Sequence, residues 1–366
     1  MTTRLARPGT VRLGTVNRLT NSPLIFDGHN DALFRLFRAG GDAVSLFEQD
    51  QGHVNVIAAQ RGGFAGGLFA IFALGQGRGL DFSIFGKPPY DAPLPEPLAQ
   101  PEALRQTIAQ AGIAHRLAAS GKVRMCLSGS DVRHAMSDHV MALVLHLEGA
   151  EAIGPDLLEL DALYALGLRS IGPVWSRPTI FGHGVPFRFP SDGDIGPGLT
   201  DHGKQLVAHC KELGVMVDTS HLNVKGFWDV AEIGVPLVAT HSNAHTMAPS
   251  ARNLTDAQLR AIGETGGMAG LNYGTMFLHP DGSASAAGAL DHAMRHLDHM
   301  IHIAGENHVG LGSDFDGAPM PEGLKGAGDL SVLRERMVQA GYGAALVEKL
   351  CHGNWLALLD RTLKAN

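Results

Sequence analysis

Potential metal ligands and acid/base groups follow several short apolar runs of this 366-residue chain. The first such run ends in LIFDGHND, where His29 and Asp31 flank Asn30 and therefore point to the same side of an extended backbone. Similar groups end four later runs: Glu148 in MALVLHLEGA, His221 in VMVDTSH, His241 in PLVATHS and Asp314 in VGLGSDFDG. Burying so many ionisable groups together without a cation would be strongly unfavourable. The pattern predicts a metal centre.

The predicted ligands are three histidines and two carboxylates, namely His29, Asp31, Glu148, His221 and His241. This mixture suits Zn²⁺, with Mn²⁺, Co²⁺ or Fe²⁺ as alternatives. Because five ligands exceed what one catalytic zinc usually takes, we predict two ions per chain, bridged by a carboxylate. Such a pair would share a hydroxide and polarise the scissile carbonyl. Asp314 is the predicted acid/base group that passes the proton on to the leaving amine.

Taken singly, these residues have simpler structural interpretations. A histidine after an apolar run is more often a hydrogen-bonded core or loop residue. Asp218 and Asp316, which stand in two of the same segments, are typical of helix caps or turns. The joint pattern of six groups favours metal chemistry over these interpretations.

Eight short, nearly continuous apolar runs predict strands that are covered on both faces, as in parallel sheets. They begin at residues 24, 66, 141, 168, 215, 236, 266 and 309. Amphipathic stretches predict helices at 102–120, 154–166, 201–213, 255–265 and 288–304. The count fits an α/β fold of the (β/α)8 TIM barrel type, as in metal-dependent hydrolases, with catalytic residues at the carboxyl ends of the strands. The alternative is an open doubly wound sheet, which usually has a glycine-rich phosphate loop where this chain has DGHND.

We expect residues 24–366 to form a single catalytic barrel domain that includes the C-terminal helices, with residues 1–23 as an N-terminal arm packed on it. Two long βα loops rich in Pro and Gly, 76–100 and 176–200, come after the second and fourth strands. In a barrel such loops lie on the face where active sites form, so we expect them to wall or cover the site. The alternative is that they are ordinary surface loops.

The composition limits the partners and the compartment. Apolar residues make up 45% of the chain and charged residues 18%, which argues against disorder, and the net charge of −7 gives no reason to expect nucleic acid or an anionic membrane as partner. No run reaches 18 apolar residues, so we predict no membrane span. Cys126, Cys210 and Cys351 are widely spaced, and the N-terminal segment lacks the apolar core of a signal peptide. We therefore expect a cytoplasmic protein, either a monomer or a homodimer.

Six short motifs follow one another from about residue 24 to near the C-terminus. They are DGHND at 27–31, EGA at 148–150, DTSH at 218–221, THSNAH at 240–245, ARN at 251–253 and GSDFDG at 312–317. In this order they resemble the membrane (renal) dipeptidase family, peptidase family M19, which are zinc metallopeptidases among the amidohydrolase-like barrels. The resemblance implies that His29 and Asp31 bind one metal and that His221 and His241 bind the other, with Glu148 bridging both.

The resemblance also assigns roles outside the ligand set. Asp314 matches the family's catalytic acid/base, and Arg252 matches an arginine that binds the substrate. A guanidinium fork suits the terminal carboxylate of a peptide. Taken alone, Arg252 could equally be a surface residue at the start of a helix.

One departure from the family concerns the segment after the fourth strand. Where the family commonly has a histidine in a segment like TLTH, this chain has GPVW, so Trp175 stands at the matching position. That histidine helps to hold the substrate oxygen as the tetrahedral intermediate forms, which leaves oxyanion stabilisation and substrate choice open here. His183, in FGHG, is either a replacement or an ordinary loop histidine. Tyr273 lies near a family tyrosine that contacts substrate, about one residue out of register.

A second group of histidines falls at helical spacing within 288–304: His292, His296, His299 and His302. Such spacing could build a metal site, but the segment precedes the eighth strand and is expected outside the barrel. We predict a solvated helix face.

The sequence thus predicts a metal-dependent dipeptidase with a binuclear centre. The metal core does not specify the acyl group, so hydrolysis of another small amide, such as an N-acyl amino acid, or of a lactone is an alternative. A non-catalytic binding protein that kept the fold is a further alternative, against which the intact set of ligands and Asp314 argues.

Overall fold

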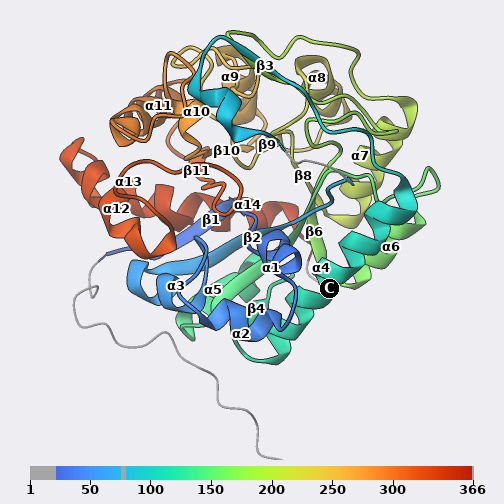
Figure 1. The fold of residues 1–366 in the computed structure, drawn as a ribbon, viewed down its shortest axis with the longest axis horizontal. Coiled ribbons are helices and arrows are strands. Elements are labelled where there is room, and N and C mark those ends of the chain that lie inside the picture. Colours follow the sequence, from blue (N-terminus) through green and yellow to red (C-terminus); the bar gives the residue numbers. More distant parts are fainter. Residues whose placement is uncertain (1–21, 76–79, 365–366) are drawn as a thin grey trace, which may run out of the picture.

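The eight strands expected from the apolar runs all form, and each pairs in parallel with its neighbours (Figure 1). The computed structural model describes residues 22–75 and 80–364, so most of the expected arm at 1–23 lies outside the described residues. One sheet has the order β1 (Ile25–Asn30), β2 (Phe64–Phe72), β5 (Met141–Glu148), β6 (Leu168–Gly172) and β8 (Met216–Val217), with β4 (Val123–Met125) beside β5. The second has the order β11 (Val309–Leu311), β10 (Met268–Leu271) and β9 (Val238–Ala239). The larger sheet is a parallel half-barrel.

Isolated parallel bridges join the two sheets at both of their edges. Asn30, at the end of β1, pairs with Phe315, which comes after β11, and Asp218, which comes after β8, pairs with Val238 of β9. The strands are buried along their whole length, which explains why their apolar runs are continuous rather than alternating.

Most helices lie around the outside of the strands, whereas the helix at residues 354–362 lies in the middle of the view in Figure 1. The helices are α1 (Ala32–Ala39), α2 (Ala43–Glu48), α3 (Val56–Gly62), α4 (Gln100–Ala119), α5 (Gly129–Ser137), α6 (Leu158–Ala165), α7 (Asp201–Leu213), α8 (Val224–Ile233), α9 (Asp256–Glu264), α10 (Thr275–Leu278), α11 (Ala289–Ala304), α12 (Leu330–Gln339), α13 (Ala344–Glu348) and α14 (Asn354–Thr362). The five predicted helices correspond to α4, α6, α7, α9 and α11. Among the residues that the structure describes, no helix has the length and apolar character needed to span a membrane.

Local sequence explains where several of these helices begin and end. Thr200 caps α7 by accepting a hydrogen bond from the backbone N–H of Gly203, and Gly214 ends the helix in a left-handed conformation. Thr255 and Gln258 form a capping box at the start of α9. These caps fix where α7 and α9 begin, and with that the ends of the loops that connect β6 to α7 and β9 to α9.

Gly28 in the DGHND motif makes room for the buried indole of Trp355 on α14. A Cβ at Gly28 would lie 2.4 Å from Cζ2 of Trp355 and 2.6 Å from the carbonyl oxygen of Thr240. The neighbouring Asp27 crosslinks the strands, because its carboxylate accepts hydrogen bonds from the backbone N–H and the hydroxyl of Ser313, both at 2.7 Å. Burial raises the pKa of Asp27 to about 7 despite these bonds. The contacts of Asp27 and Gly28 therefore fix the end of β1, from which His29 enters the site.

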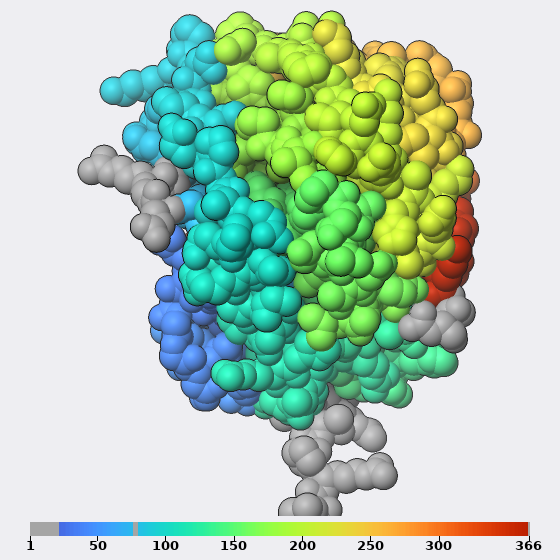
Figure 2. Space-filling model, turned by 90° about the vertical axis from the view of Figure 1, so that its right-hand side faces the viewer, coloured from blue at the N-terminus to red at the C-terminus, as the bar shows by residue number. Residues whose placement is uncertain are grey.

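The two long loops pair with each other above the sheets. β3 (Tyr90–Ala92), from the loop after β2, forms an antiparallel ladder with β7 (Phe187–Phe189), from the loop after β6. Figure 2 shows the two segments next to each other at the upper edge of the molecule. Leu80 and Phe82, from the first loop, and Phe187, from the second, line a cavity of about 220 Å³ at the carboxyl ends of the strands. The expectation that these loops wall the site is met by this arrangement.

The predicted solvated histidine face on α11 is wrong for His296. That side chain is fully buried, its Nδ1 accepts a hydrogen bond from the backbone N–H of Ala244, and its Nε2 lies 3.1 Å from the carbonyl oxygen of Leu278. His299 pairs with Asp256 at 2.7 Å, while His302 is exposed. Packing of α11 against α9 and α10 turns part of this face inward. His296 and His299 therefore contact neighbouring segments, and His302 faces solvent.

Candidate metal centre

The predicted ligands, which are far apart in sequence, meet at the carboxyl ends of the strands. Oε1 of Glu148 lies 3.0 Å from Nε2 of His221 and 3.5 Å from Nε2 of His241, and these two nitrogens lie 3.1 Å from each other. On the other side, Nε2 of His29 lies 3.7 Å from the same oxygen and 3.6 Å from Oδ2 of Asp31. All five side chains are buried. Glu148 therefore stands between a His–Asp pair and a His–His pair.

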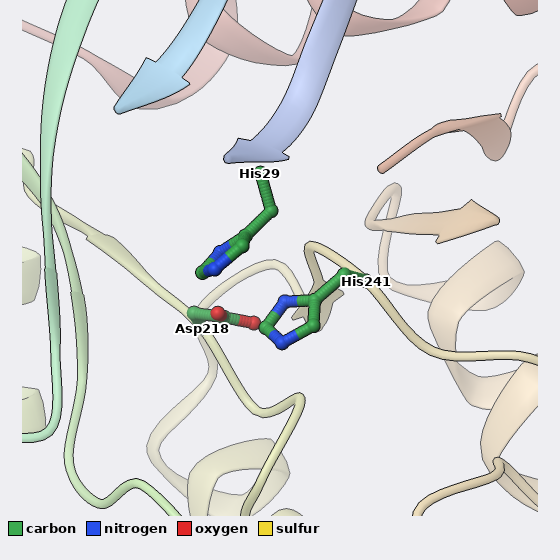
Figure 3. Close-up of side chains that lie close together, drawn as sticks. All are labelled: His29, Asp218 and His241. Atoms are coloured by element: carbon green, nitrogen blue, oxygen red, sulfur yellow. The ribbon is translucent and has the colours of Figure 1, made fainter. Parts of the chain in front are cut away.

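Two groups of potential ligands share Glu148. His29, Asp31 and Glu148 form one group, and Glu148, His221 and His241 form the other, with the ligand atoms of each group within 4.8 Å of one another. A third group combines His29 and His241 with Asp218 (Figure 3). The first two groups have the composition that two divalent ions would need if they shared a bridging carboxylate.

Both ring nitrogens of His29 are buried and have no hydrogen-bond partner. A buried polar group without a partner is costly, and a metal ion is a partner that an imidazole nitrogen commonly accepts. The residues present therefore fit a bound metal at this position.

Burial and neighbouring charges shift the pKa values of the predicted ligands strongly. Burial acts against a charge on His29, but the carboxylates of Glu148 and Asp31 outweigh it and raise the pKa of His29 to about 10. Burial raises the pKa of Glu148 well above its ordinary value and lowers the pKa of His221 and His241 well below theirs. Neutral imidazoles are the form of His221 and His241 that binds a metal, and a divalent cation would supply the positive charge that favours ionisation of Glu148.

Hydrogen bonds hold the far nitrogens of two predicted ligands. Nδ1 of His221 lies 2.9 Å from Oγ of Ser176, and Nδ1 of His241 lies 2.8 Å from Oγ1 of Thr240. Because the Thr240 hydroxyl donates to Asp218 at 2.6 Å, it is left to accept from Nδ1–H of His241. Each ring thereby presents Nε2 towards Glu148, which is the orientation that metal-binding histidines commonly need.

Asp218 is the main residue that the sequence interpretation missed. Its carboxylate accepts four hydrogen bonds, from the backbone N–H and the hydroxyl of both Ser220 and Thr240. Oδ2 also lies 3.5 Å from Nε2 of buried His146, which stands two residues before Glu148 on β5. Since Asp218 is already saturated with donors, we place it as a positioning residue behind His241 rather than as a ligand. The two-residue spacing to Glu148 is the signal that could have placed His146 on the same face of β5.

Asp314 lies in the cavity wall in a left-handed backbone conformation, with φ of 59°. Its Oδ2 accepts a hydrogen bond from Nδ2 of Asn272 at 2.9 Å, and its backbone N–H donates to the carbonyl oxygen of His29. A Cβ added at Gly317 would lie 2.2 Å from Oδ2 of Asp31 and 2.4 Å from Oδ1 of Asp314, so both carboxylates flank this glycine. Asp314 is therefore half-buried next to a predicted ligand and faces the cavity.

Two of the four predicted substrate residues line the cavity, and two do not. Arg252 is buried over the Phe277 ring, with Nη2 3.2 Å from Nε2 of His221, and burial lowers its pKa to about 10. Trp175 lines the same cavity, with its ring centroid 5.7 Å from that of His221.

The two remaining candidates lie outside the cavity lining. Tyr273 is fully buried against Phe315, because the residue after Asn272 points to the opposite side of the chain, into the core. His183 belongs to a segment whose backbone pairs with the turn after β8, where its carbonyl oxygen accepts from the N–H of Asn223.

The sequence model of the membrane dipeptidases, peptidase family M19, matches residues 13–365. The chain belongs to the membrane dipeptidase family. Membership confirms the resemblance seen in the motifs, and with it the assignment to metal-dependent dipeptidases and metallopeptidases.

Solved structures of membrane dipeptidase relatives superpose closely on this chain. A metallopeptidase from Rhodobacter sphaeroides, liganded with a phosphinate mimic of the dipeptide L-Ala-D-Ala, is 46% identical with a TM-score of 0.88, covering 93% of this chain and 99% of that one. Dipeptidase AC, another metallopeptidase of this family, is also 46% identical with a TM-score of 0.88, covering 94% of this chain and 100% of its own. An uncharacterised Klebsiella pneumoniae protein encoded in the pqqA 5' region is 45% identical over 248 residues, which are 68% of this chain and 90% of that protein.

Proposed function

We propose that this protein hydrolyses the peptide bond of dipeptides at a centre of two divalent ions, with zinc as the first candidate and Mn²⁺, Co²⁺ or Fe²⁺ as alternatives. His29 and Asp31 would hold one ion, His221 and His241 the other, and Glu148 both. The observation that carries the proposal is the pair of buried ligand groups that share Glu148. In one of these groups, both ring nitrogens of His29 lack a hydrogen-bond partner. The liganded relative from Rhodobacter sphaeroides supports a dipeptide as the substrate.

Two bound metal ions would supply an activated water and polarise the scissile carbonyl. The remaining steps fall to residues of the chain. Asp314 faces the cavity and is oriented by Asn272, so it is placed to take a proton from the attacking water and deliver it to the leaving amine. Its left-handed backbone holds the carboxylate beside Asp31 rather than along the strand.

Arg252 would bind the terminal carboxylate of the dipeptide. Its guanidinium is buried at the cavity wall and donates to the carbonyl oxygen of Ser220, and Nη2 points at the ring nitrogen through which His221 would bind an ion. Occupation of that nitrogen by an ion would free Nη2 for the substrate. A fork of two N–H groups then confines the site to short peptides with a free carboxylate.

We also propose that the eight strands close into a complete (β/α)8 barrel. The bridges between Asn30 and Phe315 and between Asp218 and Val238 support this closure, because they connect the two sheets at both edges. A cytoplasmic location is supported by the three cysteines, which are all unpaired and buried.

The function is tested by assaying purified, zinc-loaded protein on dipeptides, N-acyl amino acids and lactones, with a chelated sample as control. We expect hydrolysis of dipeptides that is lost with the metal and restored when it is added back. Turnover of N-acyl amino acids or lactones without any dipeptide would contradict the proposal and favour the alternative hydrolase.

Asp218→Asn tests how far the hydrogen-bond chain behind His241 matters. An amide at this position cannot accept all four hydrogen bonds, so Thr240 and then His241 would lose their orientation. We expect metal affinity or activity at limiting metal to fall about 10–100-fold, as for other residues behind metal ligands. The measurement is activity as a function of free zinc.

Asp229→Asn on α8 is the matched control for this change. Asp229 accepts a hydrogen bond from the backbone N–H of Leu199 and lies outside the site, so its zinc dependence should stay like the wild type. An Asp218→Asn protein with unchanged zinc dependence would show that the chain of hydrogen bonds does not position His241.

A further inference from the structure

One wall of the cavity is a continuous row of five aromatic side chains, which we call the aromatic wall: Phe34, Phe72, Trp175, Phe187 and Phe277. Successive ring centroids along this row are 5.2, 5.2, 5.4 and 6.3 Å apart. The five residues come from α1, β2, the loop after β6, β7 and α10. Five separate parts of the chain therefore build one apolar surface.

The aromatic wall lies directly beside the candidate metal centre. The ring of Trp175 lies 5.7 Å from that of His221, and the ring of Phe187 lies 6.2 Å from it. At the end of the row, the Cζ atom of Arg252 lies 5.5 Å from the centre of the Phe277 ring. A dipeptide whose carbonyl faces the ligands and whose carboxylate reaches Arg252 must place a side chain against this wall.

The wall is held from behind by a buried ion pair. Arg177 places its Cζ atom 5.6 Å from the Phe72 ring and 5.4 Å from the Trp175 ring. Its Nη2 donates to Oε1 of Glu151 at 2.8 Å and to the carbonyl oxygen of Ala73 at 2.7 Å, and both charged side chains are buried. The aromatic rings are therefore fixed before a substrate arrives, which lowers the entropic cost of binding.

Among residues 22–75 and 80–364, which the structure describes, the charged groups at the cavity are already paired or assigned to other roles. Asp316 is bound to Nε of Arg35 at 3.1 Å and to the backbone N–H of His53 at 2.7 Å. The other carboxylates and the histidine of the lining are predicted ligands or the predicted proton carrier, and Arg252 is assigned to the terminal carboxylate. The rest of the described lining is mainly apolar, with Leu74, Leu80, Phe82 and Met276 next to the aromatic wall.

From these observations we infer that the enzyme selects dipeptides with a large apolar side chain, such as Phe or Leu, and discriminates against Asp and Lys side chains. The inference rests on the proposed dipeptidase function and specifies its substrate class. The cavity measures about 220 Å³, whereas an apolar protein cavity of about 150 Å³ already holds benzene. The aromatic wall therefore offers a phenyl or isobutyl group the apolar surface it needs, within a cavity that also receives the rest of the dipeptide.

The test is a matrix of kcat/KM values for Xaa-Ala and Ala-Xaa dipeptides, with Xaa as Phe, Leu, Ala, Asp or Lys. At one position or both, we expect Phe or Leu to exceed Ala by at least about tenfold, since even one methylene in an apolar pocket discriminates by about that factor. Asp and Lys should fall below Ala. Values within threefold of one another at both positions, or a preference for a charged side chain, would overturn the substrate class while leaving the dipeptidase function standing. No turnover of any dipeptide would overturn both.

Variants connect the preference to the wall. Phe72→Ala and the milder Trp175→Leu should reduce the Phe-to-Ala ratio of kcat/KM several-fold, a ratio that is insensitive to the fraction of protein that is folded. Trp228→Ala on α8 is the matched control, because this tryptophan is 38% exposed and lies outside the cavity lining. If Trp175→Leu and Phe72→Ala keep the wild-type Phe-to-Ala ratio of kcat/KM, the aromatic wall does not determine which substrate side chain is preferred.

Discussion

Asp314→Asn should abolish dipeptide hydrolysis without removing metal. The amide cannot accept the proton of the attacking water, and a positioned acid/base group contributes about 10²–10⁴-fold to a rate. Asparagine keeps the size of the side chain and tolerates the left-handed φ of 59° at this position better than most residues, so the loop should stay in place. We therefore expect kcat to fall by at least about a hundredfold, measured by steady-state hydrolysis, while the metal content stays at the wild-type value.

Asp298→Asn provides a matched control on the outer surface of α11, where Asp298 accepts a hydrogen bond from Tyr342. It should hydrolyse dipeptides like the wild type. If Asp314→Asn retained more than about a tenth of the wild-type kcat, another group would have to carry the proton. Loss of metal from this variant would instead make Asp314 a ligand.

Glu148→Gln should remove both ions and the activity together. Glu148 is the residue common to the two ligand groups, with Oε1 within 3.7 Å of the Nε2 atoms of His29, His221 and His241. An amide removes the negative charge that would balance two cations in a buried site, so neither group stays complete. Elemental analysis after dialysis should give a metal content well below one ion per chain, with activity reduced in parallel.

The neighbouring acid at position 151 offers a close comparison. Glu151 is also buried, but it pairs with Arg177 instead of the histidines. Glu151→Gln should keep its metal, whatever it costs in stability. The metal content of His29→Ala and Asp31→Ala should lie between those of Glu148→Gln and Glu151→Gln, since each of these changes disrupts one group of ligands. A Glu148→Gln protein that retained a full complement of metal would exclude the bridging role.

The eight strands were predictable because parallel strands buried on both faces carry continuous apolar runs. β3, β4 and β7 were missed because a charged residue (Asp91, Arg124 or Arg188) interrupts each of them, so none shows a continuous apolar run. The β3–β7 ladder also depends on contact between loops about 100 residues apart, which no local pattern encodes. Helices such as α2 and α10 were missed because they are too short to show a clear helical period.

The predicted ligands were recognisable from their place after strands, because the residues that leave the carboxyl ends of parallel strands gather at one edge of a sheet. Asp218 occupies such a place as well, yet hydroxyl and N–H donors from Ser220 and Thr240 saturate it. Only tertiary geometry separates a ligand from a residue that orients one. Tyr273 shows the opposite error, because a shift of one residue along an extended chain reverses the direction of a side chain.

The binuclear centre is tested most directly by titrating metal-free protein with zinc and measuring bound zinc and dipeptide hydrolysis on the same samples. We expect zinc to saturate at two ions per chain and activity to reach its plateau only as the second site fills. Saturation at one ion per chain with full activity, or full activity in the metal-free protein, would contradict a pair of ions held by His29, Asp31, Glu148, His221 and His241.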